Sequence, residues 1–436
     1  MGSMSRRTSK QAAGPHPTGP RAAELFRLGA AVVLELAAGI FCLARGWTAL
    51  GVVLCALGVA TAASAWLVAT SLARFALGAR PRSSQDQDTA GKVPVPRKVG
   101  VLEAVFGAHG MIGSRHGEKP VETPPPTEEE AAVERQVGSM LRHSSAVEAR
   151  FSELLEPGQR ARVQQARMAE RGLTHLWLQA APPWREVSVT SDDGAFLTGR
   201  AMAVDPGSNR WVILVHGYAG RWHEMILYAR HWALQGYNLL LVEQRAHGRS
   251  QGRWRGLGYL ERRDLVAWAQ WLVGENGPAG PDARLVLHGH SMGAASVCMA
   301  SAEPDLPPQV RAAISDSSFT SGWEACARLL GDGGLPEHPT LELMRAALRL
   351  QPDGYDIAQA SALDAVRRPG PPVLFIHGAQ DSLVPVADAR ALYGAAARPK
   401  GLLVIPGAGH CQACLADPVA YYGEASAFTE RYMVNG

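Results

Sequence analysis

A Gly-x-Ser-x-Gly motif at residues 289–293 constrains the fold more than any other feature of this sequence. An apolar, β-prone run, Leu285–Leu287, enters the motif, and a helix-compatible run of small residues, Ala294–Ala302, leaves it. This order predicts a strand, a very tight turn and a helix, with Ser291 held in a strained backbone conformation and its hydroxyl clear of the sheet. The two glycines suit a place where strand and helix cross too closely for a Cβ. The alternative is a glycine-rich turn with an incidental serine.

Composition and charge favour a globular protein of roughly two or three domains. The chain has 436 residues, a hydrophobic share of 47% and a formal net charge of +3. Such mild basicity gives no argument for a nucleic-acid partner. Six cysteines in so long a chain do not make a disulfide framework. No dinucleotide-binding fingerprint, phosphate-binding loop or strong metal motif is present, so the sequence implies neither a cofactor nor a bound metal.

Two apolar runs, 28–44 and 48–73, follow a basic segment at 1–24 whose Gly, Pro and Ser content indicates disorder. The second run is uncharged and has the ~20 residues that a membrane span needs, whereas the first is shorter and contains Glu35. We therefore expect a transmembrane region at 25–78, either one helix or a two-helix hairpin. The alternatives are a cleaved signal peptide, an interfacial first helix, or two helices of a soluble core.

Basic residues flank the two apolar runs on the outside, and only Arg45 lies between them. By the positive-inside rule, two helices would leave both ends of the chain in the cytoplasm. A single helix would allow the rest of the chain to lie outside the cell. The expected location is therefore the cell membrane, on a side that depends on the number of spans.

The chain after the membrane region divides into three parts. Residues 79–127 have no hydrophobic period and contain a block of three prolines at 124–126, which predicts a linker. Residues 128–183 have a helical pattern, broken near Pro157, which predicts an extra helical layer without chemistry of its own. Residues 184–436 are expected to form one domain, with a small cap at about 320–363.

The pattern from Trp184 onward predicts an α/β fold. A hairpin signal, Ser191–Gly194, separates the first two β-prone runs, and helical segments separate most of the later ones. Two antiparallel strands followed by this alternation imply an eight-stranded, mostly parallel sheet with helices on both faces. In such sheets the chemistry gathers at the carboxyl ends of the strands. The expected strands are 186–190, 195–204, 211–216, 238–243, 284–289, 311–316, 372–377 and 401–406.

Ser291, Asp381 and His410 each come just after one of the expected strands, in this chain order. The order fits a serine nucleophile, an acid and a histidine that takes the serine proton, with the acid orienting the imidazole. Asp316 and Glu243 also lie at strand ends and are the rival acids. The sequence therefore predicts a catalytic site at one edge of the sheet.

Two backbone N–H groups, those of Tyr218 and Met292, are expected to form an oxyanion hole. Tyr218 lies in a flexible turn after the third strand, and Met292 begins the helix after the nucleophile, where N–H groups have no partner within the helix. A small cap leaves the choice of substrate to side chains near the site. From their position in the chain alone, we expect these to be Trp222, Phe319, Trp323 and Leu383.

Other histidines near strand ends receive structural interpretations. His216 and His377 precede glycines and are expected to be hydrogen-bonded turn residues. His288 and His290 have the spacing of a metal pair, but the sequence places no convincing third ligand beside them.

Two further groups of residues near the expected site have both a structural and a functional interpretation. Cys411 and Cys414 form a C-x-x-C sequence and are expected to be small residues behind His410, although such a pair can be redox-active or bind metal. Arg249, Arg253 and Arg255 are expected to form a solvated basic loop, and the sharper hypothesis is attraction for an anionic head group or membrane surface.

From about residue 184 to its end the sequence resembles the α/β-hydrolases, and is similar to a bacterial, often membrane-anchored group of serine aminopeptidase-like or lysophospholipase-like hydrolases. One departure is Glu243, where that group more often has Asp. The resemblance implies the α/β-hydrolase fold and the same roles for Ser291, Asp381 and His410. The matching segments are HGYAG at 216–220, RAHGRS at 245–250, GHSMGAAS at 289–296, DSSFTS at 316–321, FIHGAQDSLVP at 375–385 and GAGH at 407–410.

Together, the residues and the resemblance predict a membrane-anchored serine hydrolase. It would cleave carboxylic esters, or amides or thioesters, through an acyl-enzyme intermediate, and its substrate would be a small acyl ester or lipid-like molecule. One alternative is an acyltransferase on the same scaffold, which passes the acyl group to an alcohol or amine. The other is a non-catalytic membrane scaffold with a hydrolase fold.

Overall fold

The computed structural model describes residues 38, 48–78, 155–332 and 335–433. The chain divides into two compact units, one of residues 1–72 with 327–347 and the other of residues 73–326 with 348–436. The second unit contains the described β-sheet and all the residues of the candidate site.

Helix α2 (Thr48–Leu77) forms over the second apolar run. The first run lies outside the described residues apart from Ala38, and so do the linker and the first part of the helical extension, from 79 to 154. Among the residues that the structure describes, no helix combines the length and the apolar character needed to cross a membrane. The predicted transmembrane hairpin is therefore not confirmed.

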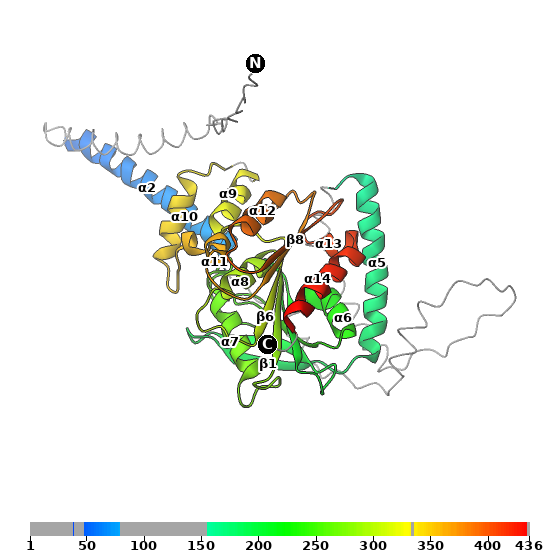
Figure 1. Ribbon diagram of the computed structural model, residues 1–436. Coiled ribbons are helices and arrows are strands. Elements are labelled where there is room, and N and C mark those ends of the chain that lie inside the picture. The colour runs from blue at the N-terminus through cyan, green and yellow to red at the C-terminus, as the bar shows by residue number, and fades with distance from the viewer. Residues whose placement is uncertain (1–37, 39–47, 79–154, 333–334, 434–436) are drawn as a thin grey trace, which may run out of the picture. The chain divides into compact units, whose positions relative to one another are not determined.

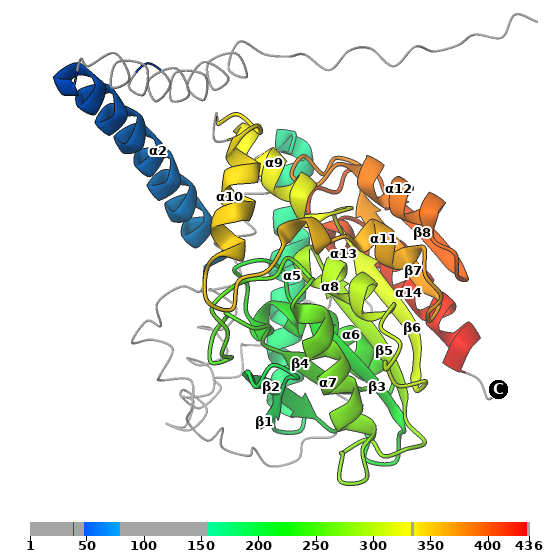
Figure 2. The ribbon, with the colours of Figure 1, turned by 90° about the vertical axis from the view of Figure 1, so that its left-hand side faces the viewer.

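An eight-stranded sheet organises the second unit (Figure 1), in the order β1-β2-β4-β3-β5-β6-β7-β8, which the strand labels of Figure 2 follow. Strand β2 pairs antiparallel with β1 and with β4, and the other neighbours pair in parallel. The predicted eight-stranded, mostly parallel sheet is confirmed. The strands are β1 (Arg185–Thr190), β2 (Phe196–Met202), β3 (Arg210–Val215), β4 (Asn238–Val242), β5 (Arg284–His290), β6 (Val310–Asp316), β7 (Val373–Gly378) and β8 (Lys400–Ile405).

Helices cover both faces of this sheet (Figure 1). One face, seen from the front in Figure 2, carries α7 (Glu261–Val273), α8 (Met292–Ala300), α11 (Ala362–Val366) and α12 (Val386–Ala395). The other carries the short helix η4 (Trp222–Met225), α6 (Ile226–Leu234), α13 (Ala413–Ala416) and α14 (Pro418–Met433). The segment expected to form a cap contains α9 (Gly322–Asp332), α10 (Thr340–Arg349) and η5 (Ile357–Gln359).

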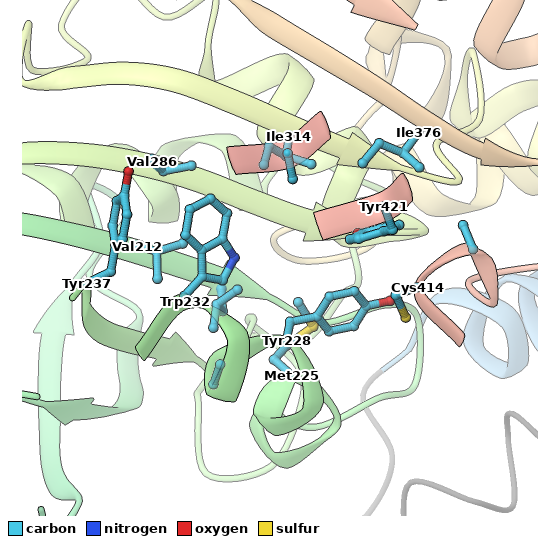
Figure 3. Packing of buried hydrophobic residues seen from close by; sticks show 14 of the residues in the cluster. Val212, Met225, Tyr228, Trp232, Tyr237, Val286, Ile314, Ile376, Cys414 and Tyr421 are labelled. Carbon is cyan, nitrogen blue, oxygen red and sulfur yellow. The ribbon is translucent and has the colours of Figure 1, made fainter. Parts of the chain in front are cut away.

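The core follows from strands that are buried on both faces. Every residue of β4 and β7 is buried, which explains why parallel strands of this kind appear in the sequence as continuous apolar runs. Under α6 and α14, aromatic rings fill the space between helices and sheet (Figure 3). These rings include those of Tyr228, Trp232, Tyr237 and Tyr421, and Val212, Val286 and Ile314 meet them from the strands.

Helix α5 (Pro157–Ala180) lies outside α6 and α13 (Figure 1). Leu155 and Val163 join the core cluster, and a Cβ built on Gly409 would lie 3.3 Å from Leu155 Cδ2. Glu170 accepts two hydrogen bonds from the Arg230 guanidinium, at 2.9 and 2.8 Å, which ties α5 to α6. This part of the helical extension therefore packs against the loop that precedes His410.

Candidate active site

Ser291 lies on the turn between β5 and α8, with φ 54° and ψ −121°, a region that costs energy for any residue other than glycine. Its N–H donates to the Asp316 carbonyl oxygen at 2.8 Å, which fixes the turn against the end of β6. A Cβ at Gly289 would lie 2.3 Å from the Gly293 carbonyl oxygen, and one at Gly293 would lie 2.2 Å from that of Val215. At Gly289 the strand and the helix cross too closely for a side chain, as predicted, whereas at Gly293 the start of the helix lies against the backbone at the end of β3.

Asp381 and His410 follow β7 and β8, two neighbouring parallel strands. The N–H of Gln380 donates to the Ala408 carbonyl oxygen at 2.9 Å, which joins the turn after β7 to the loop after β8. Both side chains are almost completely buried. The ends of the two strands therefore hold the carboxylate and the imidazole next to each other.

Ser291, His410 and Asp381 form one hydrogen-bonded chain. His410 Nε2 lies 2.9 Å from Ser291 Oγ, and His410 Nδ1 lies 2.7 Å from Asp381 Oδ2. A carboxylate only accepts hydrogen bonds, so Nδ1 carries a proton, and Nε2 of the neutral imidazole accepts from the Ser291 hydroxyl. The structure thus brings together three side chains that the sequence placed at separate strand ends.

Asp381 is surrounded by donors. Burial opposes its ionisation, but His410 and His377 hold the pKa of the carboxyl far below its usual range. Its Oδ1 accepts from the N–H groups of Leu383 and Val384 at 3.0 and 2.8 Å. The group is therefore a fixed anion beside the imidazole of His410.

The backbone around Tyr218 passes close to Ser291. A Cβ built on Gly217 would lie 3.2 Å from Ser291 Cβ, and Met292 is the first residue of α8. The Tyr218 side chain packs on the buried guanidinium of Arg255, whose Cζ is 5.1 Å from the ring centroid. The two segments expected to form the oxyanion hole therefore both border the nucleophile.

His247 supports the same turn and has no role in the sequence-based prediction. Its Nε2 accepts the Ala219 N–H at 3.1 Å, and its Nδ1 donates to the Arg245 carbonyl oxygen at 2.8 Å. Burial holds its pKa well below the usual value, so the ring is neutral, as this bonding pattern requires. The only signal in the sequence was its place in the RAHGRS segment.

His216 and His377 are hydrogen-bonded residues at strand ends. His216 donates from Nδ1 to the Gly217 carbonyl oxygen and accepts the Gln244 N–H at Nε2, and burial lowers its pKa to about 4. His377 Nε2 lies 3.2 Å from Asp381 Oδ2. Burial lowers the pKa of His377, but the bond to Asp381 outweighs this effect and leaves the pKa above its usual value. His377 therefore contacts the proposed catalytic carboxylate, which the sequence did not indicate.

The two rival acids have other partners. Asp316 is completely buried, and its Oδ2 accepts from the hydroxyl of Tyr421 at 2.9 Å. Burial raises its pKa, against the opposing effect of that hydrogen bond. Glu243 accepts from Arg221 and from the Arg249 N–H. The carboxylate that meets His410 Nδ1 is that of Asp381.

His288 and His290 are buried in the core. Trp232 donates to His288 Nδ1 and Tyr421 lies on its other nitrogen, both at 3.0 Å. Burial lowers the pKa of both histidines to about 3. In the part of the chain that the structure covers, no three His, Cys, Asp or Glu residues are grouped so as to hold a metal ion.

The cysteine pair was expected to be two small residues behind His410, and the arginine loop was expected to be solvated. Cys411 and Cys414 are free thiols, one partly exposed and the other buried. Arg249 forms an ion pair with Glu186, and both side chains are exposed. Arg255, in contrast, is only 2% exposed, so the loop is not uniformly solvated.

The four side chains expected to contact substrate occupy different environments. Phe319 is buried, and Trp323 and Leu383 are partly exposed. Trp222 packs edge-on against Trp184 and lines a cavity of about 20 Å³. That cavity is polar, because its other walls come from Thr198, Gly199, Arg200, Arg221, Glu243 and Arg249.

Comparison with known proteins identifies related sequences over this part of the chain. The model of a family described as the alpha/beta hydrolase family matches residues 212–422. Rv2307c of Mycobacterium tuberculosis, an uncharacterized protein, is 32% identical over 233 residues, which is 52% of this chain and 73% of that protein. The uncharacterized protein YqkD of Bacillus subtilis is 28% identical over 200 residues, and the match spans 46% of this chain and 64%, less than two thirds, of YqkD. Among solved structures, the esterase Pf2001 of Pyrococcus furiosus is 26% identical with a TM-score of 0.47, covering 58% of this chain and 92% of that one.

Proposed function

Because the chain belongs to the alpha/beta hydrolase family, we propose that it is a serine hydrolase that cleaves carboxylic esters through an acyl-enzyme intermediate. Family membership supports hydrolase activity in general. The observation that carries the finer proposal is the hydrogen-bonded chain from Ser291 through His410 to Asp381. Ser291 has a strained backbone and is partly exposed, which suits a nucleophile.

In the proposed mechanism, Ser291 Oγ attacks the acyl carbon while His410 Nε2 takes the hydroxyl proton. The tetrahedral oxyanion is held by the N–H groups of Tyr218 and Met292, each contributing about 3 kcal/mol. His410 then gives its proton to the leaving alcohol, and the acyl group stays on Ser291 as an ester. Asp381 stabilises the imidazolium in both halves of the reaction.

Water completes the cycle. His410 takes a proton from the attacking water, the second tetrahedral intermediate collapses, and Ser291 recovers its proton as the carboxylic acid leaves. Amides and thioesters react by the same steps with an amine or a thiol as leaving group. An alcohol or amine in place of water would make the protein an acyltransferase, and product analysis with and without such an acceptor separates the two activities.

A panel of acyl esters of varied chain length and head group tests this proposal, with the wild type, Ser291→Ala and Ser301→Ala compared. Ser301 is a buried serine at the end of α8, and its hydroxyl donates to the Val297 carbonyl oxygen. The Ser301→Ala variant therefore controls for the loss of a buried hydroxyl. We expect hydrolysis by the wild type and Ser301→Ala, and a loss of at least about 10³-fold in Ser291→Ala. Hydrolysis retained in Ser291→Ala, or no hydrolysis of any ester by the wild type, contradicts the proposal.

Attachment to the cell membrane is a second proposal, and it rests on the apolar runs of the sequence. The run at 48–73 is uncharged, and along α2 several large apolar side chains are exposed, namely Val52, Val59, Leu67 and Val68. Exposed apolar side chains gathered on one helix favour contact with lipid over contact with water. The basic flanks favour a cytoplasmic hydrolase domain if two segments span the membrane.

A further inference from the structure

Two further residues with positive φ are linked to the nucleophile through a series of hydrogen bonds. Ser317 has φ 59° and Cys411 has φ 54°, compared with 54° for Ser291. Such conformations are strained for residues other than glycine, and they persist where the surroundings fix them, often at functional sites. The hydrogen bonds around Ser317 show what fixes them here.

Ser317 uses its hydroxyl in both directions. Its Oγ accepts the Cys411 N–H at 3.2 Å and donates to Asp316 Oδ1 at 2.9 Å. A backbone N–H cannot accept, so the Ser317 oxygen is the acceptor toward Cys411, and the hydroxyl proton is shared with the carboxyl group of Asp316. The residue is completely buried, and its own N–H donates to the Ile376 carbonyl oxygen of β7 at 2.9 Å.

Asp316 connects this hydroxyl to the nucleophile. Its carbonyl oxygen accepts the Ser291 N–H at 2.8 Å, while its Oδ2 accepts from the hydroxyls of Tyr421 and Tyr228 at 2.9 and 3.3 Å. Both rings belong to the aromatic core under α6 and α14 (Figure 3). The carboxylate is thus held from both sides by buried groups that have little freedom to move.

These contacts form a bracket between the two halves of the site. One end is the bond from the Ser291 N–H to the Asp316 carbonyl oxygen, and the other is the bond from the Cys411 N–H to Ser317 Oγ. Cys411 directly follows His410 in the chain. The bracket therefore sets the loop that carries the imidazole relative to the turn that carries the nucleophile.

We propose that Ser317 is a positioning residue of the active site, which holds the His410 loop in register with Ser291 through its bond to the Cys411 N–H. The inference rests on the proposed function, because it assigns Ser317 to the alignment of a proton transfer between Ser291 and His410. That transfer needs the two groups within hydrogen-bond reach, and a displacement of 1 Å can lower a rate by about 10²-fold.

The test compares three variants with the wild type. Ser317→Ala removes the hydroxyl and keeps the strain, and Ser317→Gly removes both. Ser318→Ala is the matched control, since Ser318 is a neighbouring buried serine whose hydroxyl donates to the Phe319 carbonyl oxygen. For each protein, kcat and KM are measured on one ester, together with the rate of labelling by a fluorophosphonate probe.

We expect kcat and the labelling rate to fall by about 10- to 100-fold in both Ser317 variants, with KM within about twofold of the wild type, because alignment is lost and binding is not. Ser318→Ala should keep the wild-type values. The inference is overturned if Ser317→Ala keeps its kcat, if Ser317→Gly keeps its kcat while Ser317→Ala loses it, or if Ser318→Ala loses as much as Ser317→Ala.

The wild type separates this inference from the proposed function. A wild type that hydrolyses esters and is labelled, next to an equally active Ser317→Ala, overturns only the role of Ser317. A wild type that neither hydrolyses nor is labelled overturns the proposed function, and the role of Ser317 with it. A folding defect would appear as a lower Tm in Ser317→Ala than in Ser318→Ala, and Ser317→Gly, which relieves the strain, then decides whether the hydroxyl itself matters.

Discussion

Asp381 is the residue on which the charge of the proposed site depends. Its Oδ2 meets His410 Nδ1 at 2.7 Å, and the donors around it keep its pKa far below the usual range. Such a carboxylate is ionised at neutral pH, so it fixes the tautomer of His410 without taking up its proton.

Asp381→Asn should therefore lower kcat by roughly 10³- to 10⁴-fold, because an amide stabilises the imidazolium poorly and favours the wrong tautomer. The measurement is steady-state ester hydrolysis at neutral pH. Asp388→Asn is the control, because Asp388 is also buried after β7 but accepts from the Thr320 N–H. Equal rates for Asp381→Asn and the wild type would show that another acid serves His410.

The sequence predicts residues whose role follows from chain order. Ser291, Asp381 and His410 each follow a strand, and parallel strands end at the same edge of the sheet, so their meeting could be anticipated. His247 and Ser317 could not be identified in this way. Each acts through a bond to the backbone of another loop, and the sequence gives no spacing rule for such contacts.

Helix α5 shows how an element without chemistry can support the site. Its Glu170 joins Arg230 and His231 of α6, with Nε2 of His231 3.1 Å from Oε1. Burial opposes ionisation of Glu170, but the His231 hydrogen bond and the Arg230 charge hold its pKa below the usual 4.5. A carboxylate with a lowered folded-state pKa stabilises the fold above its unfolded pKa, and this stability is lost as the pH falls from about 4.5 through the folded-state value.

Glu170→Gln should lower the free energy of unfolding by about 1–3 kcal/mol at pH 7, because it breaks charged hydrogen bonds to a buried guanidinium. The difference from the wild type should shrink as the pH falls below 4.5, because Glu170 becomes protonated first in the unfolded chain and then in the folded one. Denaturant titrations at neutral and acid pH measure both values. Asp364→Asn, which breaks an exposed pair with Arg367, should change little at either pH, and a Glu170→Gln effect that stays constant down to pH 3 contradicts the account.

The ends of helices and strands were predictable where the spacing of apolar residues along the chain changes. The strands begin and end within one or two residues of their expected positions for most of the sheet, and α5 begins at Pro157, where the helical pattern breaks. The docking of α5 on α6 was not predictable. Glu170 and Arg230 join the two helices, and neither residue differs in the sequence from an ordinary solvated charge on a helix.

For the molecule as a whole, the sequence indicates a membrane region before a hydrolase domain. The described residues contain no helix suited to crossing a bilayer, so attachment rests on the apolar runs at 28–44 and 48–73 and on the basic residues around them. The hydropathy of each apolar run predicts affinity for lipid, but it does not decide whether one or two helices span the membrane.

Deletion of residues 25–72 should release the protein from membranes and leave its specific ester hydrolase activity within about threefold, because the candidate site lies in the other unit. Membrane flotation in a sucrose gradient, before and after an alkaline carbonate wash, measures the first effect. The full chain should stay with the membranes after the wash. Full-length protein that remains in the soluble fraction would contradict attachment.

The most direct test of the central claim is to locate the residue that reacts with a fluorophosphonate. The intact protein is treated with the probe and digested, and the modified peptide is identified by mass spectrometry. We predict a single adduct on Ser291, absent in Ser291→Ala and formed at least about 10²-fold more slowly in His410→Ala, because the imidazole takes the proton of the attacking hydroxyl. An unmodified wild-type protein, or an adduct that persists in Ser291→Ala, would contradict the claim that Ser291, His410 and Asp381 act together as a catalytic site.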